Sequence, residues 1–192
     1  MAIRYRSGRS AIYAGEVETL RGDSVVLRPP REEDVELAYS WDRDPELAAW
    51  NGRSPINLSL GAARRDYLRR WRDRSVKTFI IEVDGEAVGM ATLYDFRHDS
   101  CEIGIKIGAR SLWGRNLGTE TVKLLVSYAF EELDLKAVRG STLAHNRRMQ
   151  RVFEKCGFEL AGEGSIVSGY DSRRYTELFY ERRRDDQSPP AR

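Results

Sequence analysis

Hydrophobic and polar residues recur with two different periods along the chain, and the change of period marks the expected elements. Short segments rich in β-branched and aromatic residues, several with a period of two, are typical of strands. The Asp84-Gly85 pair between two of these segments predicts a tight β-hairpin. The expected strands are SVVLR (24–28), KTFIIEV (77–83), EAVGMATLYDF (86–96), SCEIGIKI (100–107), KAVRGSTL (136–143) and YTELFYER (175–182).

A helical period governs the segments between these strands. The clearest apolar stripe follows the i, i+3, i+4, i+7 spacing of a buried helix face, at Val122, Leu125, Val126, Ala129, Phe130 and Leu133. A second stripe follows Asn146, a good N-cap residue, and ends at Gly157. The segment containing Pro45 and Pro55 is expected to be a loop. Helices are therefore expected over 31–44, 60–74, 117–133 and 146–157. In the second of these, Leu60, Tyr67, Leu68 and Trp71 share one helical face.

The order of these elements bounds the fold. Strand, turn, helix and strand follow one another between residues 100 and 143, which describes a crossover that joins two parallel strands. Ligands of such sheets bind where the first strand ends. We expect a mixed α+β fold in one domain over residues 20–182, with an N-terminal arm of uncertain order (1–19) and a charged tail (183–192).

Composition removes several function classes. Among 192 residues, 32 are Lys or Arg and 30 are Asp or Glu, so the formal net charge of +2 disfavours a nucleic-acid partner. No apolar segment is long enough for a membrane, and two cysteines favour a reduced, cytoplasmic setting. Neither cysteine nor either histidine has zinc-ligand spacing, so no metal is expected.

Two glycines mark a candidate anion site. Gly114 and Gly118 lie in the turn that opens the helix beginning near Leu117. Backbone N–H groups at such a turn, with the helix dipole, hold a phosphate without a cationic side chain. Glycine also serves tight turns for purely conformational reasons, and the turn alone leaves both interpretations open.

Three segments together resemble the GNAT superfamily of acyl-CoA-dependent N-acetyltransferases over residues 20–182. They are LRPPREED (27–34), IGIKIGARSLWGRNLGTE (103–120) and AHNRRMQRVFEKCGFELAGE (144–163), and the first looks closest to the branch acting on ribosomal-protein N-termini. The resemblance implies three α/β/α layers, with a mixed, mostly antiparallel central sheet and a parallel, splayed strand pair at the acyl-CoA site.

The resemblance also implies the coenzyme site. Acetyl-CoA would be the cosubstrate, its pyrophosphate bound by backbone amides and its pantetheine arm held between the splayed strands. The residues implied are Ile105, Lys106, Ile107, Leu112, Trp113, Gly114, Arg115, Asn116, Leu117, Gly118, Thr119, Asn146 and Phe153. Asn146 is equally explained as a simple helix cap, and Trp113 as an anchor of the loop.

The chain departs from the family pattern at two positions. Asn116 stands in place of the loop's middle glycine and is expected to adopt the left-handed conformation. Phe153 stands where many members have the tyrosine that protonates the leaving thiolate. Another group, water or unassisted departure would have to replace it. The candidate acids are Ser141, Cys156, Tyr170 and Tyr175. Of these four, we choose Tyr175 as the candidate catalytic residue.

A base is also expected, because an amine is mostly protonated at neutral pH. Glu102 is our candidate, since alternation places it on the face opposite the Ile103, Ile105 and Ile107 stripe. A solvated strand glutamate is the alternative interpretation.

The resulting hypothesis is an N-acetyltransferase that works by direct attack in a ternary complex. The acceptor would be a protein N-terminus, a lysine or a small amine, selected by residues 42–60 and 164–175. A non-catalytic acyl-CoA-binding or sensing module is the alternative, and a homodimer is a family-level expectation.

Overall fold

A single mixed sheet organises the molecule in the computed structural model, which describes residues 17–184. Its order is β1-β2-β3-β4-β5-β6-β8-β7, in which β5 and β6 are parallel and all other neighbours are antiparallel. This arrangement confirms the expected fold class. The strands are β1 (Leu20–Arg21), β2 (Val26–Arg28), β3 (Lys77–Val83), β4 (Glu86–Arg97), β5 (Ser100–Ile107), β6 (Ala137–Leu143), β7 (Glu159–Val167) and β8 (Arg174–Arg183).

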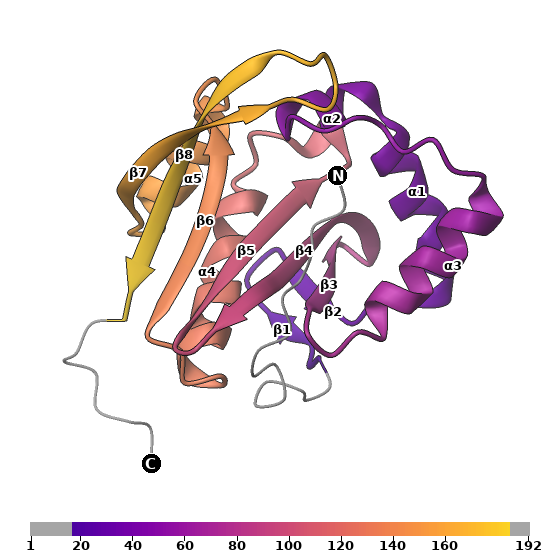
Figure 1. The fold of residues 1–192 in the computed structure, drawn as a ribbon. Coiled ribbons are helices and arrows are strands. Elements are labelled where there is room, and N and C mark those ends of the chain that lie inside the picture. The colour runs from indigo at the N-terminus through magenta and orange to yellow at the C-terminus, as the bar shows by residue number, and fades with distance from the viewer. Residues whose placement is uncertain (1–16, 185–192) are drawn as a thin grey trace.

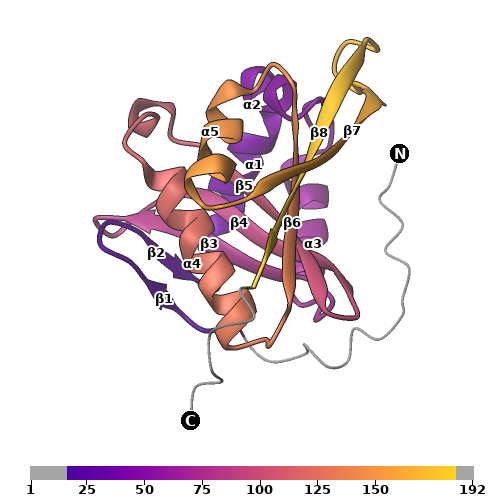
Figure 2. The same cartoon turned by 90° about the vertical axis from the view of Figure 1, so that its left-hand side faces the viewer.

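Helices cover both faces of the sheet. Helices α4 and α5 lie on one face, and α1 and α3 lie on the other (Figures 1 and 2). The helices are α1 (Val35–Arg43), α2 (Pro45–Trp50), α3 (Leu60–Trp71), α4 (Leu117–Glu131) and α5 (Arg147–Lys155), with short 3₁₀ turns η2 (Glu32–Asp34) and η3 (Arg110–Leu112).

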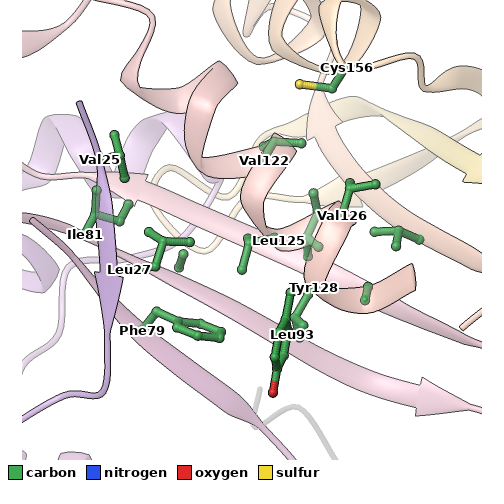
Figure 3. Packing of buried hydrophobic residues seen from close by; sticks show 14 of the residues in the cluster. Val25, Leu27, Phe79, Ile81, Leu93, Val122, Leu125, Val126, Tyr128 and Cys156 are labelled. Atoms are coloured by element: carbon green, nitrogen blue, oxygen red, sulfur yellow. The ribbon is translucent and has the colours of Figure 1, made fainter. Parts of the chain in front are cut away.

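The main core lies between the sheet and α4. Val122, Leu125 and Val126, from the stripe expected on this helix, are buried against the sheet. Figure 3 shows them facing Leu27 and Phe79, with α4 crossing above the strands. This packing fixes the position of the α4 N-terminus relative to the end of β5, and so places the glycine turn.

The opening motif LRPPREED has a structural role that its sequence alone does not reveal. Arg28 at the end of β2 donates two hydrogen bonds of 2.8 Å to the Asp34 carboxylate and a third, of 2.7 Å, to Glu82 on β3. Burial would raise the pKa of Asp34, but the bonds from Arg28 and from the Arg31 amide lower it below its usual value. The network ties the start of α1 to the sheet across Pro29-Pro30.

Two elements differ from the expectations. Pro45 begins α2 rather than a loop, because Asp44 caps the amides of Glu46 and Leu47 and proline suits the first helical position. Strand β7 was not expected, since its glycines and polar residues hide any alternation. Leu60, at the start of α3, is exposed. Most of the expected arm (1–19) and tail (183–192) lie outside the described residues.

Candidate active site

The parallel strands β5 and β6 separate part-way along their length. Their backbone pairing ends at Glu102 and Arg139, although β5 continues to Ile107 and β6 to Leu143. The backbone of β5 beyond Glu102 therefore has no strand partner on its β6 side. The expected splay is present, and its unpaired N–H and C=O groups are available to a ligand.

A cavity of about 340 Å³ lies at the open end of this splay. Its walls come from α2, the end of β5, the loop before α4, the first turn of α4 and one face of α5. The lining residues are Leu47, Trp50, Asn51, Ile105, Lys106, Ile107, Leu112, Trp113, Gly114, Asn116, Leu117, Gly118, Thr119, Asn146, Arg148, Met149, Arg151, Val152 and Lys155.

The loop before α4 leaves the helix N-terminus open. Gly114 has a φ of 85°, and Asn116 a φ of 61°, which confirms the left-handed conformation expected for the asparagine. Asn116 is the N-cap residue, yet its side chain does not cap the helix, and its Oδ1 instead accepts a hydrogen bond of 3.2 Å from Lys155. The first amides of α4 therefore remain available to an anion.

Neither the backbone conformation nor the packing requires a glycine at position 118. It lies in the first turn of α4 with ordinary helical backbone, and an added Cβ would meet Ile105 and Val152 at 3.5 Å, an ordinary contact distance. Glycine within a helix costs roughly 1 kcal/mol relative to alanine. Glycine at this place in the cavity wall leaves room for a ligand to approach the helix backbone closely.

Basic side chains surround the cavity. Lys106, Arg148, Arg151 and Lys155 line it, and the lining formed by residues 17–184 includes no acidic side chain. Arg148, Arg151 and Lys155 were not predicted as site residues. Their i, i+3, i+7 spacing in the sequence nevertheless places them on one face of a helix. The charge and the open helix terminus together suit a polyphosphate ligand.

Two tryptophans hold Arg148 across the cavity. Its guanidinium lies 4.5 Å from the ring centre of Trp113 and 5.4 Å from that of Trp50 on α2. Trp113 donates a hydrogen bond of 2.9 Å from Nε1 to the Ile107 carbonyl, so it anchors the loop to β5. Through Arg148, Trp50 thereby links α2 to α5.

Two further loop and strand residues are committed to neighbours. Lys106 forms an ion pair with Asp42 of α1, whose carboxylate also accepts from Tyr67. Arg110 pairs with Asp44 and Glu46 at the start of α2, which directs it away from a role as a free phosphate ligand. Arg115 is exposed in the loop, and its side chain does not line the cavity.

Asn146 is confirmed as a helix cap, and it also lies in the cavity lining. Its Oδ1 accepts a hydrogen bond of 3.2 Å from the Met149 amide and so caps α5, while the residue lines the cavity. The cap uses the carbonyl oxygen and leaves the amide NH₂ as a donor.

Phe153 lies beneath the splay and outside the cavity lining. It is 1% exposed, and its ring packs on Tyr180 at 4.9 Å and Phe158 at 5.0 Å. A Cβ added to Gly140 would lie 2.6 Å from the Phe153 Cζ and 3.4 Å from the Ile103 Cγ1. The ring edge therefore fills the base of the gap between β5 and β6.

Glu102 lies at the last paired position of β5, on the face opposite α4. Burial raises its pKa, and the charge of Arg139 on β6 partly opposes that effect. Arg139 also approaches the Asp95 carboxylate, at 3.5 Å. A half-buried carboxyl with a raised pKa at the base of the splay is suited to accept a proton.

Tyr175 is not in contact with the cavity. It donates a hydrogen bond of 2.6 Å to Asp171, and this bond is the main reason why its pKa is raised. Its ring packs on His145 at 5.2 Å, and His145 packs on Trp50 at 5.6 Å. Two rings therefore join Tyr175 to the cavity wall.

The other candidate acids have different surroundings. Ser141 donates a hydrogen bond of 2.7 Å to Glu177. Burial raises the pKa of Cys156, whose Sγ lies 3.4 Å from the Thr119 carbonyl oxygen. Tyr170 is exposed in the turn between β7 and β8.

The structure brings the two presumed acceptor segments together. The Gly169 amide, in the β7–β8 turn, donates a hydrogen bond of 2.9 Å to the Gly52 carbonyl, and Ser54 donates to the Gly169 carbonyl. Figure 1 shows the β7–β8 turn reaching over to α2. We call residues 51–55 and 168–173 together the roof, because these hydrogen bonds join them beside α2.

Within residues 17–184, none of the helices has the length and hydrophobicity of a membrane-spanning segment, and no three His, Cys, Asp or Glu residues are grouped as metal ligands would be.

Comparison with known proteins relates this site to a family. Residues 24–159 match the family model described as an acetyltransferase (GNAT) domain. The chain is 26% identical over 182 residues to aminoglycoside N(6')-acetyltransferase type 1 of Klebsiella pneumoniae, covering 88% of this chain and 90% of that protein. It is 27% identical over 142 residues to spermidine N(1)-acetyltransferase of Escherichia coli (strain K12), covering 73% and 75%.

Solved structures share the fold. Spermidine N-acetyltransferase from Vibrio cholerae, in complex with CoA and spermine, superposes with a TM-score of 0.77 at 18% identity over 84% of this chain and 96% of that one. AAC(6')-Ib in complex with ribostamycin and coenzyme A gives a TM-score of 0.69 at 24% identity, over 84% and 94%. These names do not support the narrower assignment to the branch acting on ribosomal-protein N-termini.

Proposed function

This chain belongs to the GNAT acetyltransferase family, and we propose that it transfers an acetyl group from acetyl-CoA to a primary amine by direct attack in a ternary complex. The observation that carries the proposal is Gly118. The glycine is unexplained by conformation or packing, and it lies beside uncapped helix amides in a basic cavity at the end of a splayed strand pair. A pyrophosphate ester with a long, narrow arm fits this combination.

The chain's own groups then have distinct roles. Amides of the loop and the first turn of α4 bind the pyrophosphate, with Arg151 and Lys155 supplying positive charge. The unpaired edge of β5 from Ile105 to Ile107 and the Asn146 amide hold the pantetheine arm. A backbone N–H of β5 directed at the thioester oxygen stabilises the negative charge that develops there, an effect of roughly 3 kcal/mol for one well-placed donor.

Proton transfer is assigned to Glu102. Its carboxylate takes a proton from the acceptor ammonium, and the neutral amine attacks the thioester carbon from the face opposite α4. The carbon–sulfur bond breaks as the carbonyl re-forms, and the thiolate leaves without a tyrosine at position 153. The proton that the attacking nitrogen still carries passes through water to the departing thiolate, which gives the neutral amide and the free thiol. A thiol with a pKa near 8.5 is an adequate leaving group at neutral pH. Tyr175 remains the candidate for a more distant proton donor, through His145.

The acceptor we favour is a small amine with more than one positive charge. Glu102, Asp95 and Glu177 provide carboxylates on the acceptor face, and the relatives described above are named for aminoglycoside and spermidine. A protein N-terminus, as in the ribosomal branch, and lysine are the other acceptors in the hypothesis. A homodimer also remains a family-level proposal.

Thiol release from acetyl-CoA tests the proposal. Purified protein is mixed with acetyl-CoA and a panel containing spermidine, an aminoglycoside, N-terminal peptides and monoamines, and free thiol is followed with time. Release that depends on one of the amines supports the enzyme. Tight calorimetric binding of acetyl-CoA with no amine-dependent release across the panel contradicts it and favours the non-catalytic binding module.

A further inference from the structure

We propose that Glu177, oriented by Ser141, binds a second ammonium group of the acceptor, so that the enzyme selects di- and polyamines over monoamines. The inference rests on the proposed function and adds a specificity-determining residue to the same reaction. It comes from the placement of this hydrogen-bonded pair beside the splay rather than from the position of Glu102.

Ser141 lies where the separated strands leave room for the reacting groups. It is two residues beyond Arg139, the last residue of β6 that pairs with β5. The neighbouring Gly140 faces Phe153 and the α5 side, so strand alternation directs Ser141 to the opposite, acceptor face. Its hydroxyl is therefore beside the splay on the side from which an amine approaches.

Glu177 extends this feature to the next strand. It lies on β8, opposite Leu143 of β6, and its Oε1 accepts the hydrogen bond of 2.7 Å from the Ser141 hydroxyl. That bond fixes the carboxylate and uses one of its several acceptor positions. The remaining lone pairs stay available to an ammonium donor.

The charge of Glu177 is not neutralised within the described part of the chain. No basic side chain of residues 17–184 forms an ion pair with it, although sixteen other pairs occur there. Arg139, on the same face of β6, is directed to Asp95. A half-buried carboxylate without a cationic partner favours a charged ligand, because hydrogen bonds between two ions are about twice as strong as neutral ones.

The separation of Glu102 and Glu177 matches a substrate with two amines. The register places them two strands apart and four residues along. With strand spacings of about 4.8 Å and a rise of about 3.3 Å per residue, their Cα atoms lie about 16 Å apart. Both side chains project from the same face of the sheet. The distance between the two carboxylates is therefore enough for a substrate whose two amines are joined by several methylene groups. One amine then reaches Glu102 while the second is held by Glu177.

Steady-state kinetics with spermidine and a monoamine of similar length test the inference. Glu177→Gln keeps the shape of the side chain and its capacity to accept from Ser141, but removes the charge. We expect KM for spermidine to rise by about tenfold or more, with kcat, KM for acetyl-CoA and kcat/KM for the monoamine within about twofold of wild type. Ser141→Ala should move the spermidine KM in the same direction by less.

Glu181→Gln is the matched control. Glu181 lies on the same strand and face as Glu177, but at the end where β5 and β6 are paired, and it forms an ion pair with Arg183. It should leave the preference for spermidine unchanged. Equal losses for both amines in Glu177→Gln, no loss at all, or a wild-type enzyme that prefers monoamines or peptides would overturn this inference alone. A wild-type protein without amine-dependent thiol release would overturn the proposed function as well.

Discussion

Burial of Glu102 at the base of the splay makes this carboxylate a stronger base than that of an exposed glutamate. An exposed glutamate is too weak a base to remove a proton from an ammonium, whereas a raised pKa brings it closer to neutrality. The pKa of Glu102 is raised chiefly by burial, with Arg139 opposing the effect. The sequence indicated the residue and its face, but the surroundings that change its pKa come from two other strands.

The Glu102→Gln substitution should therefore change the pH dependence as well as the rate. The carboxyl is inactive when protonated, so wild-type kcat/KM should fall as the pH drops through its raised pKa. The variant should lose this acidic limb and about 10²-fold or more in kcat/KM, the usual scale of general-base catalysis. The measurement is kcat/KM from pH 5 to pH 9, with Glu163→Gln on exposed β7 as the control. Wild-type values in Glu102→Gln from pH 6 to pH 9 would contradict the role.

The backbone conformation of Asn116 was predicted from the chemistry of its side chain. Asparagine tolerates the left-handed region better than other non-glycine residues, and its φ of 61° confirms that reasoning. The hydrogen bond from Lys155 to its side chain was not predictable, because it joins residues 39 positions apart on elements whose relative placement depends on packing.

At the scale of elements, the contact between α5 and β6 shapes the base of the splay. Phe153 was expected at the coenzyme site, whereas its buried ring fills the gap between Ile103 and Gly140. Glycine at this position lets the ring approach the strand backbone. The two residues are therefore complementary, and a larger side chain on β6 would have to displace a ring already held by Phe158 and Tyr180.

Gly140→Ala should destabilise the protein by about 1–3 kcal/mol, the usual range for overpacking a well-filled core. The added Cβ would lie 2.6 and 2.8 Å from two ring atoms of Phe153, closer than real contacts allow. Urea unfolding of the free protein measures the change in the free energy of unfolding.

Two further variants make this test specific. Gly162→Ala, on β7, is the control, because its Cβ would meet nothing within 4 Å and its backbone is not left-handed. It should change stability by much less. Adding Phe153→Leu to Gly140→Ala should recover part of the free energy of unfolding that Gly140→Ala loses, since the shorter side chain gives the new methyl group room. Equal effects of the two alanine variants would show that the ring contact is not the cause.

At the scale of the whole molecule, elements with a regular period were predictable and contacts between irregular segments were not. The hairpin of β3 and β4, the crossover from β5 to β6 and the long α4 all follow from alternation, turn residues and helical stripes. Helix α2 is too short to show a period, and the glycines of β7 interrupt one. The meeting of the roof segments depends on two loops more than 100 residues apart, for which sequence periodicity carries no information.

The roof matters because it joins α2 to the turn between β7 and β8. Trp50 on α2 contacts Arg148 on α5 and His145 just before that helix, and α2 runs into the roof within a few residues. Ser54 and Gly52 then connect it to Gly169 between β7 and β8. Loosening this connection should affect binding of the acceptor more than binding of the coenzyme, whose phosphates we propose to lie at α4 and α5.

Ser54→Ala should raise KM for the acceptor by about two- to tenfold and leave KM for acetyl-CoA unchanged. The reason is the loss of one hydrogen bond across the roof, worth about 0.5–1.5 kcal/mol, while the backbone bond between Gly52 and Gly169 remains. Hydrogen exchange of the roof amides should become faster, with α4 unaffected. Ser75→Ala is the control, because Ser75 forms its side-chain bond within a turn, to Asp73. Unchanged roof exchange, or a rise in KM for acetyl-CoA alone, would show that the roof does not hold the acceptor.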